Sequence, residues 1–210
     1  MTQKPMPRLN ERAPAFKAPS THGDISLDMY KGKWIVLFSH PADFTPVCTT
    51  EFMAFAKRTR DFEKLNVQLI GLSIDSIYSH IAWMRNIKEK FGVEVTFPVI
   101  ADLSMEVASS YGMIHPGASN TATVRSVFLI DPDQNVRAMV YYPMTAGRSV
   151  EEIYRLVQAL QTNTEKNMAT PEGWQPGESC IVPPPKTMRE ADERMKSAHQ
   201  VTDWYFSKTK

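Results

Sequence analysis

The chain has 210 residues, enough for one full domain with a substantial extension or for two small domains. Hydrophobic residues make up 42% of it, and 24 lysines and arginines against 23 aspartates and glutamates leave a net charge of +1. This balance is ordinary for a soluble globular protein and provides no long-range field for a nucleic-acid backbone or an anionic membrane. No apolar run is long enough to span a bilayer. We therefore expect neither a nucleic-acid nor a membrane partner.

Apolar periodicity predicts alternating strands and helices up to about residue 160. Strands are predicted at 34–39, 67–74, 97–101, 124–130 and 136–142, and helices at 46–65, 76–91, 105–111 and 150–160. Gly92 is expected to end the second helix, and the turn-forming residues 131–135 to join the last two strands as a hairpin. This order requires a mixed sheet with helices on its faces, and it fits a thioredoxin-like α/β architecture.

The composition changes after Asn167. Pro171, Pro176 and the three prolines at 183–185 predict an extended arm. Beyond the arm, apolar residues at helical spacing predict a helix: Met188, Ala191, Met195, Ala198, Val201 and Tyr205. The helix either packs on its own domain or, together with the arm, covers a second subunit. We favour the second subunit because such arms are hard to bury on one small domain. The predicted organisation is a thioredoxin-like domain over 1–166 and a C-terminal extension over 167–210.

The cysteine count indicates a reducing compartment. Cys48 and Cys180 are too few for a disulfide framework of the secreted kind, and no apolar segment typical of a signal peptide is present. A cytoplasmic location with reduced thiols is therefore expected, and each cysteine is considered for its reactivity. The absence of Cys-x-x-Cys and His-x-x-x-His pairs and of phosphate-binding glycine loops predicts no metal site and no nucleotide cofactor.

The most informative segment runs from Ser39 to Glu51, between the first predicted core strand and the first long helix. Ligands of open α/β sheets bind in such loops. Thr45 suits the N-cap and Pro46 the first helical position, so Cys48 is expected in the first turn, near free backbone N–H groups and the positive end of the helix dipole. An ordinary thiol of pKa ~8.5 is only a few per cent thiolate at pH 7, and the thiolate is the nucleophile. A helix start alone changes this by less than about tenfold, so a cationic neighbour is required.

Arg125 is the candidate cation. It begins an otherwise apolar predicted strand, and a buried arginine is costly unless it meets an anion. Two anions are open at this point: a carboxylate such as Glu51, in a structural salt bridge, or the thiolate of Cys48.

The motif Pro41-x-x-x-Thr45-x-x-Cys48 resembles the active-site motif of the peroxiredoxins, the alkyl hydroperoxide reductase C/thiol-specific antioxidant family. The longer string over 38–51 is similar to the one-cysteine branch of that family. The resemblance continues at 114–116, 123–126, 142–143, 147–148 and 171–174 and so covers nearly the whole chain. It implies a thiol-dependent peroxidase that needs no cofactor and reduces hydrogen peroxide and organic hydroperoxides through a cysteine sulfenic acid.

The resemblance also implies a role for each motif residue. Cys48 corresponds to the peroxidatic cysteine, and Thr45 to the residue that hydrogen-bonds the attacking sulfur and the peroxide. Pro41 is expected to shield the sulfur, and Arg125 to stabilise both thiolate and substrate. These roles agree with the chemistry, because attack on the O–O bond moves charge onto the departing oxygen, where fixed donors lower the barrier. Three further residues are expected to orient these groups: His40, Glu51 and Arg148.

The chain departs from two-cysteine relatives where a resolving cysteine is expected, because it has Thr170 there. Cys180, ten residues further on, is either a small apolar residue at a packed interface or an unusual resolving thiol from a neighbouring subunit. Without a resolving thiol, an external reductant (a thioredoxin-like protein or a small thiol) must reduce the sulfenic acid. The family commonly forms dimers and rings of five dimers, so the resemblance implies a homodecamer.

Two other functions use the same cysteine. A peroxide-sensing or chaperone-like redox switch would undergo a single oxidation that changes assembly, whereas an enzyme would consume peroxide steadily with a supplied thiol. A cysteine hydrolase lacks an evident histidine base next to Cys48. The remaining histidines are interpreted as structural or solvent-facing: His22, His80, His115 and His199.

Overall fold

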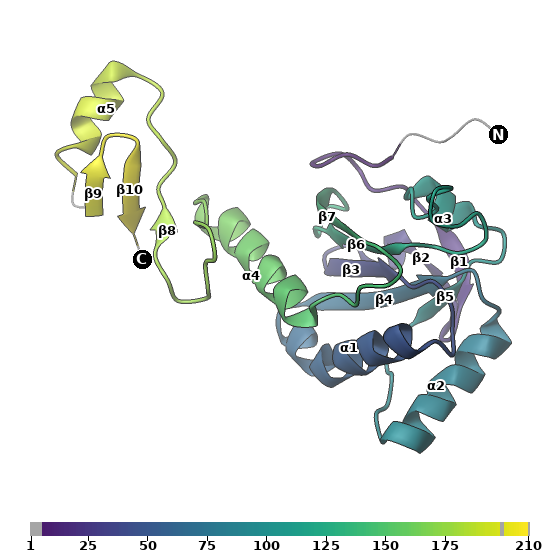
Figure 1. Ribbon diagram of the computed structural model, residues 1–210. Coiled ribbons are helices and arrows are strands. Elements are labelled where there is room, and N and C mark those ends of the chain that lie inside the picture. Colours follow the sequence, from purple (N-terminus) through teal and green to yellow (C-terminus); the bar gives the residue numbers. More distant parts are fainter. Residues whose placement is uncertain (1–5, 198–199, 210) are drawn as a thin grey trace. The chain divides into compact units, whose positions relative to one another are not determined.

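A computed structural model describes residues 6–197 and 200–209 of the chain. The chain divides into two compact units, one ending at Val150 and the other beginning at Glu151 (Figure 1). In the described ranges, no helix combines the length and the apolar character that a membrane crossing requires.

The first unit is built on a seven-stranded mixed sheet. Its strand order is β2-β1-β5-β4-β3-β6-β7. The strands are β1 (Lys17–Ser20), β2 (Gly23–Ser26), β3 (Trp34–Ser39), β4 (Val67–Ser73), β5 (Val99–Ala101), β6 (Arg125–Ile130) and β7 (Val136–Tyr142). Strands β3, β4 and β5 run parallel, whereas β6 pairs antiparallel with both β3 and β7. The mixed sheet and the predicted hairpin are thereby confirmed.

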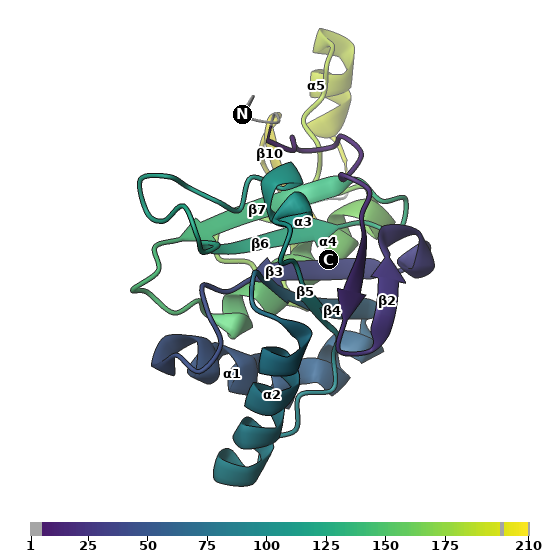
Figure 2. The same cartoon turned by 90° about the vertical axis from the view of Figure 1, so that its right-hand side faces the viewer.

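Helices cover both faces of this sheet. They are α1 (Pro46–Lys64), α2 (Ile77–Phe91) and α3 (Glu106–Ser110), and a 3-10 turn η1 (Leu27–Tyr30) follows β2. Figures 1 and 2 show α1 and α2 on one face and α3 on the opposite face. Each helix was predicted within a few residues of its ends. Gly92 ends α2 in the left-handed conformation, with φ of 67°, as its position after Phe91 predicts.

The period-two alternation of β3 supplies both layers of the core. Ile35 and Leu37 join an apolar cluster that includes residues of α3, whereas Phe38 points to the α1 face. There its ring stacks on Phe55 at 4.1 Å between centroids and meets Phe52 edge-on at 5.5 Å. The strand is buried along its whole length because both of its faces are covered.

The N-terminal hairpin of β1 and β2 was not predicted. Its two strands have four residues each, with the sequences KAPS and GDIS, and they contain only one β-branched hydrophobic residue, Ile25. The hairpin joins the sheet where Ser20 pairs with Ile100 of β5. Tertiary contact with the sheet edge, which local periodicity does not report, therefore determines this element.

The second unit contains two helices and a small sheet. The helices are α4 (Val150–Lys166, its first residue belonging to the first unit) and α5 (Met188–Arg194). The strands β8 (Cys180–Ile181), β9 (Gln200–Asp203) and β10 (Phe206–Thr209) form an antiparallel sheet in the order β8-β10-β9. Residues 167–179 contain no helix, as their prolines predict.

The predicted helix from Met188 to Tyr205 is wrong in its second half. It ends at Arg194, and Val201 and Tyr205 belong to the β9–β10 hairpin, while Ala198 lies outside the described residues. The stretch after residue 200 is rich in β-branched and aromatic residues, which favour a strand, and the helical spacing of its apolar residues was coincidental.

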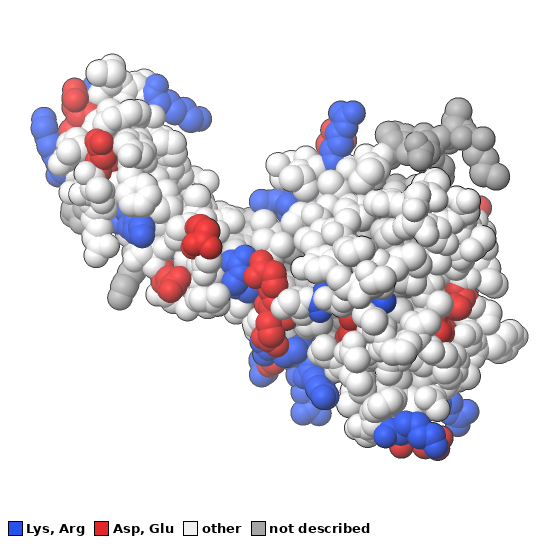
Figure 3. All heavy atoms as spheres, in the orientation of Figure 1, with Lys and Arg blue, Asp and Glu red and all other residues white. Residues whose placement is uncertain are grey.

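Charges of both signs are mixed on the face of the molecule that Figure 3 draws. On the face in Figure 3, basic and acidic side chains lie next to one another in small groups. Exposed ion pairs of this kind include Lys88 with Glu94 and Lys90 with Glu89, both at 2.6 Å. Such pairs contribute little to stability because solvent screens them.

Candidate active site

The loop between β3 and α1 places a cysteine at a helix start. Thr45 occupies the N-cap with extended backbone, and Pro46 is the first helical residue, as predicted. The hydroxyl of Thr45 does not cap the helix, however, and instead donates a hydrogen bond of 2.9 Å to the carbonyl oxygen of Ala42. Cys48 is therefore in the first turn, fully buried, where backbone N–H groups lack intrahelical partners. Pro41, in the same loop, is also buried.

Arg125, the first residue of β6, reaches this cysteine across the sheet. Its Nη1 atom lies 3.4 Å from Sγ of Cys48 and donates a hydrogen bond of 2.6 Å to Oε2 of Glu51. Its Nε atom donates to the carbonyl oxygen of Met144 at 2.9 Å, which fixes the plane of the guanidinium group. The two partners left open by the sequence, the carboxylate and the sulfur, are thus contacted by one nitrogen atom.

Glu51 also binds a second guanidinium group, that of Arg148. Arg148 donates from Nε to Oε1 at 2.8 Å and from Nη2 to Oε2 at 2.7 Å, a bidentate arrangement, and its backbone N–H donates to Oε1 at 2.7 Å. Burial raises the pKa of the Glu51 carboxyl group, but the hydrogen bonds and positive charge of Arg148, with a smaller contribution from Arg125, outweigh it. The pKa of Glu51 therefore lies below its ordinary value.

The buried cluster beside Cys48 carries more positive than negative charge. Arg125, Arg148 and Glu51 are all buried, so water screens their charges poorly. Two guanidinium groups and one carboxylate leave an excess of one positive charge beside Cys48. Negative charge that develops at or near the sulfur during a reaction would therefore meet a fixed positive charge, at 3.4 Å from Sγ in the case of Arg125 Nη1.

A second buried network adjoins the loop. Asp43 accepts from His40 Nε2 at its Oδ1 atom and lies opposite His80 Nδ1 at its Oδ2 atom, both at 2.8 Å. The ring of His40 packs against Phe52, which follows Cys48 by one turn of α1, with 4.7 Å between ring centroids. The structure thus brings His40 to the helix face that carries Cys48.

His80 and Asp43 are the residues whose part in this region the sequence did not reveal. His80, on α2, was interpreted as structural or solvent-facing, and it proves to be fully buried against the loop. The three-residue spacing of His40 and Asp43 hints at their pairing, but nothing in the sequence connects them with a histidine 37 residues beyond Asp43.

The same three residues are the one candidate metal group in the described ranges. A donor atom from each of His40, Asp43 and His80 lies within 4.8 Å of the other two. The short direct contacts between imidazole nitrogens and carboxylate oxygens are those of hydrogen bonds, and we therefore interpret the group as a hydrogen-bond network.

The remaining histidines lie elsewhere. His22 is exposed in the turn between β1 and β2. The ring of His115 stacks on Tyr141, and its Nε2 atom is 3.2 Å from the carbonyl oxygen of Gly112. His199 lies outside the described residues.

Cys180 belongs to the second unit. It is 1% exposed and lies in a small apolar cluster with Ala159 and Trp174, against which Met168 packs. Both Cys48 and Cys180 are free thiols.

A buried thiol at a helix start, held by a guanidinium group beside the central strand of a thioredoxin-like sheet, defines a thiol-based oxidoreductase. Comparison with known proteins specifies the class further. The model of the AhpC/TSA family matches residues 9–139, and the model of the C-terminal domain of 1-Cys peroxiredoxin matches residues 159–198. The chain therefore belongs to the AhpC/TSA family, with the C-terminal domain of the one-cysteine peroxiredoxins, and is a thiol-dependent peroxidase whose peroxidatic cysteine is Cys48.

Individual relatives agree along the whole chain. A peroxiredoxin of Aquifex aeolicus is 55% identical over 98% of this chain and 97% of its own length. Peroxiredoxin 2 of Picrophilus torridus is 54% identical over 94% of this chain and 96% of its own. The structure of a yeast mitochondrial 1-Cys peroxiredoxin matches with a TM-score of 0.85 at 41% identity, covering 97% of this chain and 99% of that one. The predicted thioredoxin-like fold is thereby confirmed.

Proposed function

We propose that this peroxiredoxin reduces hydrogen peroxide and organic hydroperoxides in the cytoplasm through a sulfenic acid on Cys48. The thiolate attacks the nearer peroxide oxygen, a sulfur–oxygen bond forms, and the O–O bond breaks. The departing oxygen takes up a proton and leaves as water or an alcohol. The observation that carries this proposal is the contact of 3.4 Å between Arg125 Nη1 and Cys48 Sγ. Two free thiols are consistent with a reducing compartment.

We assign the neighbouring side chains by what they offer to this reaction. Arg125 supplies a positive charge beside the sulfur and hence beside the oxygen atoms that approach it. The hydroxyl of Thr45 uses its proton on Ala42, so its oxygen lone pairs can accept the proton of a bound peroxide. Pro41 offers no N–H group and limits access of water to the loop. Glu51 and Arg148 hold Arg125 in place.

Steady-state turnover distinguishes the enzyme from a redox switch. With peroxide and an excess of a dithiol, the wild-type protein is expected to consume many equivalents of peroxide at a constant rate. The Cys180→Ser variant is expected to retain this activity, and Cys48→Ser to lose it. Consumption that stops after one equivalent in the wild type would support the switch.

We further propose that an external thiol reduces the sulfenic acid. Cys180 is nearly fully buried beside Trp174, so its participation requires local opening of the second unit. Mass spectrometry after one equivalent of hydrogen peroxide tests this proposal. We expect no crosslink between Cys48 and Cys180, whereas a crosslink that disappears in Cys180→Ser would show a resolving role and overturn the proposal.

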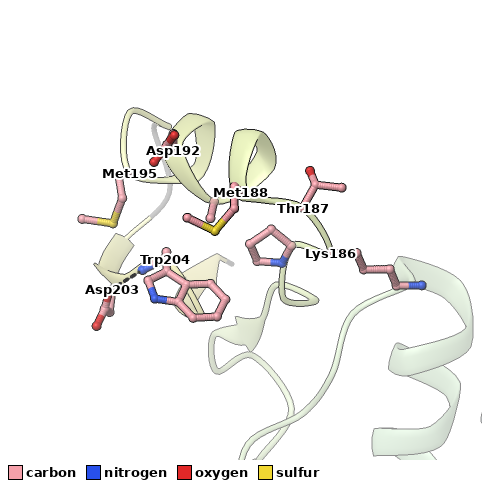
Figure 4. Close-up of a pocket in the computed structure, with 9 residues that line it drawn as sticks. Lys186, Thr187, Met188, Asp192, Met195, Asp203 and Trp204 are labelled. Atoms are coloured by element: carbon pink, nitrogen blue, oxygen red, sulfur yellow. Dashed lines mark hydrogen bonds between the residues drawn. The ribbon is translucent and has the colours of Figure 1, made fainter.

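The second unit carries an apolar surface suited to a second copy of the chain, consistent with a role of the extension over 167–210 in oligomer contacts. Met188 on α5 is 82% exposed, and Trp204 in the β9–β10 turn is 46% exposed. They line a hollow of about 570 Å³, and Figure 4 shows their side chains on opposite sides of it. Contiguous exposed apolar surface of this kind marks an interaction site, and we propose that a neighbouring subunit covers it.

The first unit carries a separate set of exposed apolar side chains. Phe44, Tyr78 and Leu103 are 56%, 81% and 66% exposed. The loops beside them are joined by hydrogen bonds. The N–H of Asp43, next to Phe44, donates to Asp75, and the N–H of Asp102, next to Leu103, donates to the carbonyl oxygen of Ser73. One self-complementary surface yields a dimer, whereas a closed ring of dimers requires a second surface. The two sets support our proposal of a homodimer that assembles into a pentamer of dimers.

A further inference from the structure

Two neutral histidines carry one ring N–H group each, but the ring nitrogens of His40 and His80 face three acceptor oxygens. His40, Asp43 and His80 are all buried, and their network joins the loop before Cys48 to α2 and to β5. Asp43 Oδ1 faces His40 Nε2 and Asp43 Oδ2 faces His80 Nδ1, both at 2.8 Å. The other ring nitrogen of His80, Nε2, lies 3.1 Å from the carbonyl oxygen of Ile100.

Both ring nitrogens of His80 face atoms that only accept hydrogen bonds. A backbone carbonyl oxygen has no proton to donate, so Nε2 must carry one. An ionised carboxylate is also acceptor-only, so Nδ1 must carry one too. A histidine with a proton on each ring nitrogen is an imidazolium cation.

Protonation of Asp43 is the alternative that would leave His80 neutral. Burial raises the pKa of Asp43, but the hydrogen bonds and charges of His40 and His80 outweigh it and hold the pKa well below its usual range. In ordinary reference compounds, moreover, an imidazole is more basic than a carboxylate by more than two pKa units, so a shared proton belongs on the ring.

A metal ion between the two side chains is a second alternative. Tetrahedral zinc bonds of about 2.0–2.2 Å separate a ligand nitrogen from a ligand oxygen by about 3.3 Å. The 2.8 Å between His80 Nδ1 and Asp43 Oδ2 matches a charge-assisted hydrogen bond instead.

His40 is then the neutral member of the network. Its Nε2 atom donates to Asp43, whereas its Nδ1 atom is buried and has no hydrogen-bond partner among residues 6–197 and 200–209. A proton at Nδ1 would leave a buried donor unpaired, which is costly. Burial also lowers the pKa of His40. The His40 ring therefore has a single tautomer, with a proton on Nε2 and none on Nδ1.

We propose that His80 is an imidazolium cation that forms a buried ion pair with Asp43, and that this pair is a positioning device for the loop carrying Pro41 and Thr45. The proposal rests on the peroxidase function of Cys48. The pair holds the side chain of Asp43, and Asp75 Oδ2 accepts from the backbone N–H of Asp43 at 3.0 Å, so this residue is fixed from both ends. The carbonyl oxygen of His40 accepts from Thr123 at 2.7 Å, which anchors the beginning of the loop.

Nitrogen NMR of ring-labelled protein at pH 7 tests the ion pair directly. The wild-type protein is expected to show a His80 ring with protons on both nitrogens, and the His80→Asn variant to lose that signal. Asp43→Asn can accept from His40 and donate to a neutral His80, and it is therefore expected to leave His80 with a proton on Nε2 only. A bare ring nitrogen on His80 in the wild type would overturn the proposal. So would one equivalent of zinc in the purified protein, measured by elemental analysis.

Kinetics test the positioning role separately. Asp43→Asn and His80→Gln are expected to lower kcat/KM for hydrogen peroxide by about tenfold or more, because misplacement of reacting groups by about 1 Å has effects of that order. His22→Gln, a surface control, is expected to stay within about twofold of the wild type. If both network variants also stay within about twofold while peroxide is still consumed, the positioning role is wrong. Loss of turnover in the wild type itself would instead refute the peroxidase function.

Discussion

At the scale of single residues, the site depends on a carboxylate shared by two guanidinium groups. Glu51 accepts from both Arg125 and Arg148 on the buried face of α1, one turn beyond Cys48. Breaking such a buried pair by removing one partner leaves an uncompensated charge, which is strongly unfavourable. We therefore propose that Glu51 holds Arg125 in position beside Cys48.

We expect Arg125→Lys to lower kcat/KM for peroxide by about 100-fold. An ammonium group is a point charge and cannot contact Cys48, Glu51 and the carbonyl oxygen of Met144 in the fixed geometry of a guanidinium group. Initial rates with a thiol donor provide the measurement, with Arg137→Lys, a partly exposed arginine on β7, as the matched control. Activity within threefold of the wild type in Arg125→Lys would contradict the assigned role.

The pH dependence of stability also reports on Glu51. Because the folded protein lowers its pKa, the carboxylate contributes stability that is present above the unfolded value of about 4.3 and is lost as pH falls through the lower folded value. The difference in unfolding free energy between the wild type and Glu51→Gln is therefore expected to shrink from pH 7 to pH 3. Urea unfolding at several pH values measures it, and a constant difference would argue against this linkage.

At the scale of elements, local signals predicted the start of α1 but not all of its details. Thr45 and Pro46 mark the helix start correctly, because backbone preferences at these positions are local. The direction of the Thr45 hydroxyl depends on where the loop brings the carbonyl oxygen of Ala42, which the sequence does not report. The β1–β2 hairpin escaped prediction for a similar reason, since its stability comes from pairing with β5.

Helix α3 illustrates how one side chain supports a short element. The carboxylate of Asp102 accepts from the backbone N–H of Val107 at 3.3 Å and of Ala108 at 2.7 Å. We expect Asp102→Ala to lower the free energy of unfolding by about 1–2 kcal/mol, because both N–H groups lose a buried acceptor. Asp102→Asn keeps an acceptor oxygen and is expected to lose less. Equal losses in the two variants, measured by urea unfolding, would contradict this role.

At the scale of the whole molecule, the core topology could be predicted because alternating strands and helices allow few connections. The contact of Arg125 with a buried anionic partner could be predicted because a cation at the start of an apolar strand needs an anion. The pairing of Asp43 with His80 could not, because it depends on how α2 packs beside the loop. The β9–β10 hairpin could not either, because its apolar residues happen to fall at helical spacing.

Assembly provides a prediction at this scale. Charged substitutions at the two exposed apolar sets are expected to act differently, because each set is proposed to form a different interface. Tyr78→Asp should dissociate a ring into smaller species, and Trp204→Asp should weaken a second contact. Met29→Asp, at another exposed apolar residue, serves as the control and should leave the assembly unchanged. Sedimentation velocity measures all three, and identical profiles for every variant would contradict the assignment of the two surfaces.

The most direct measurement identifies the sulfur atom that peroxide oxidises, and so tests whether Cys48 is the peroxidatic cysteine. The protein is treated with one equivalent of hydrogen peroxide in the presence of dimedone, which traps sulfenic acids, and its peptides are examined by mass spectrometry. We expect the adduct on Cys48 in both the wild type and Cys180→Ser, and no adduct in Cys48→Ser. An adduct confined to Cys180, or the same rate of peroxide loss after the sulfur at position 48 is replaced by oxygen, would contradict this expectation.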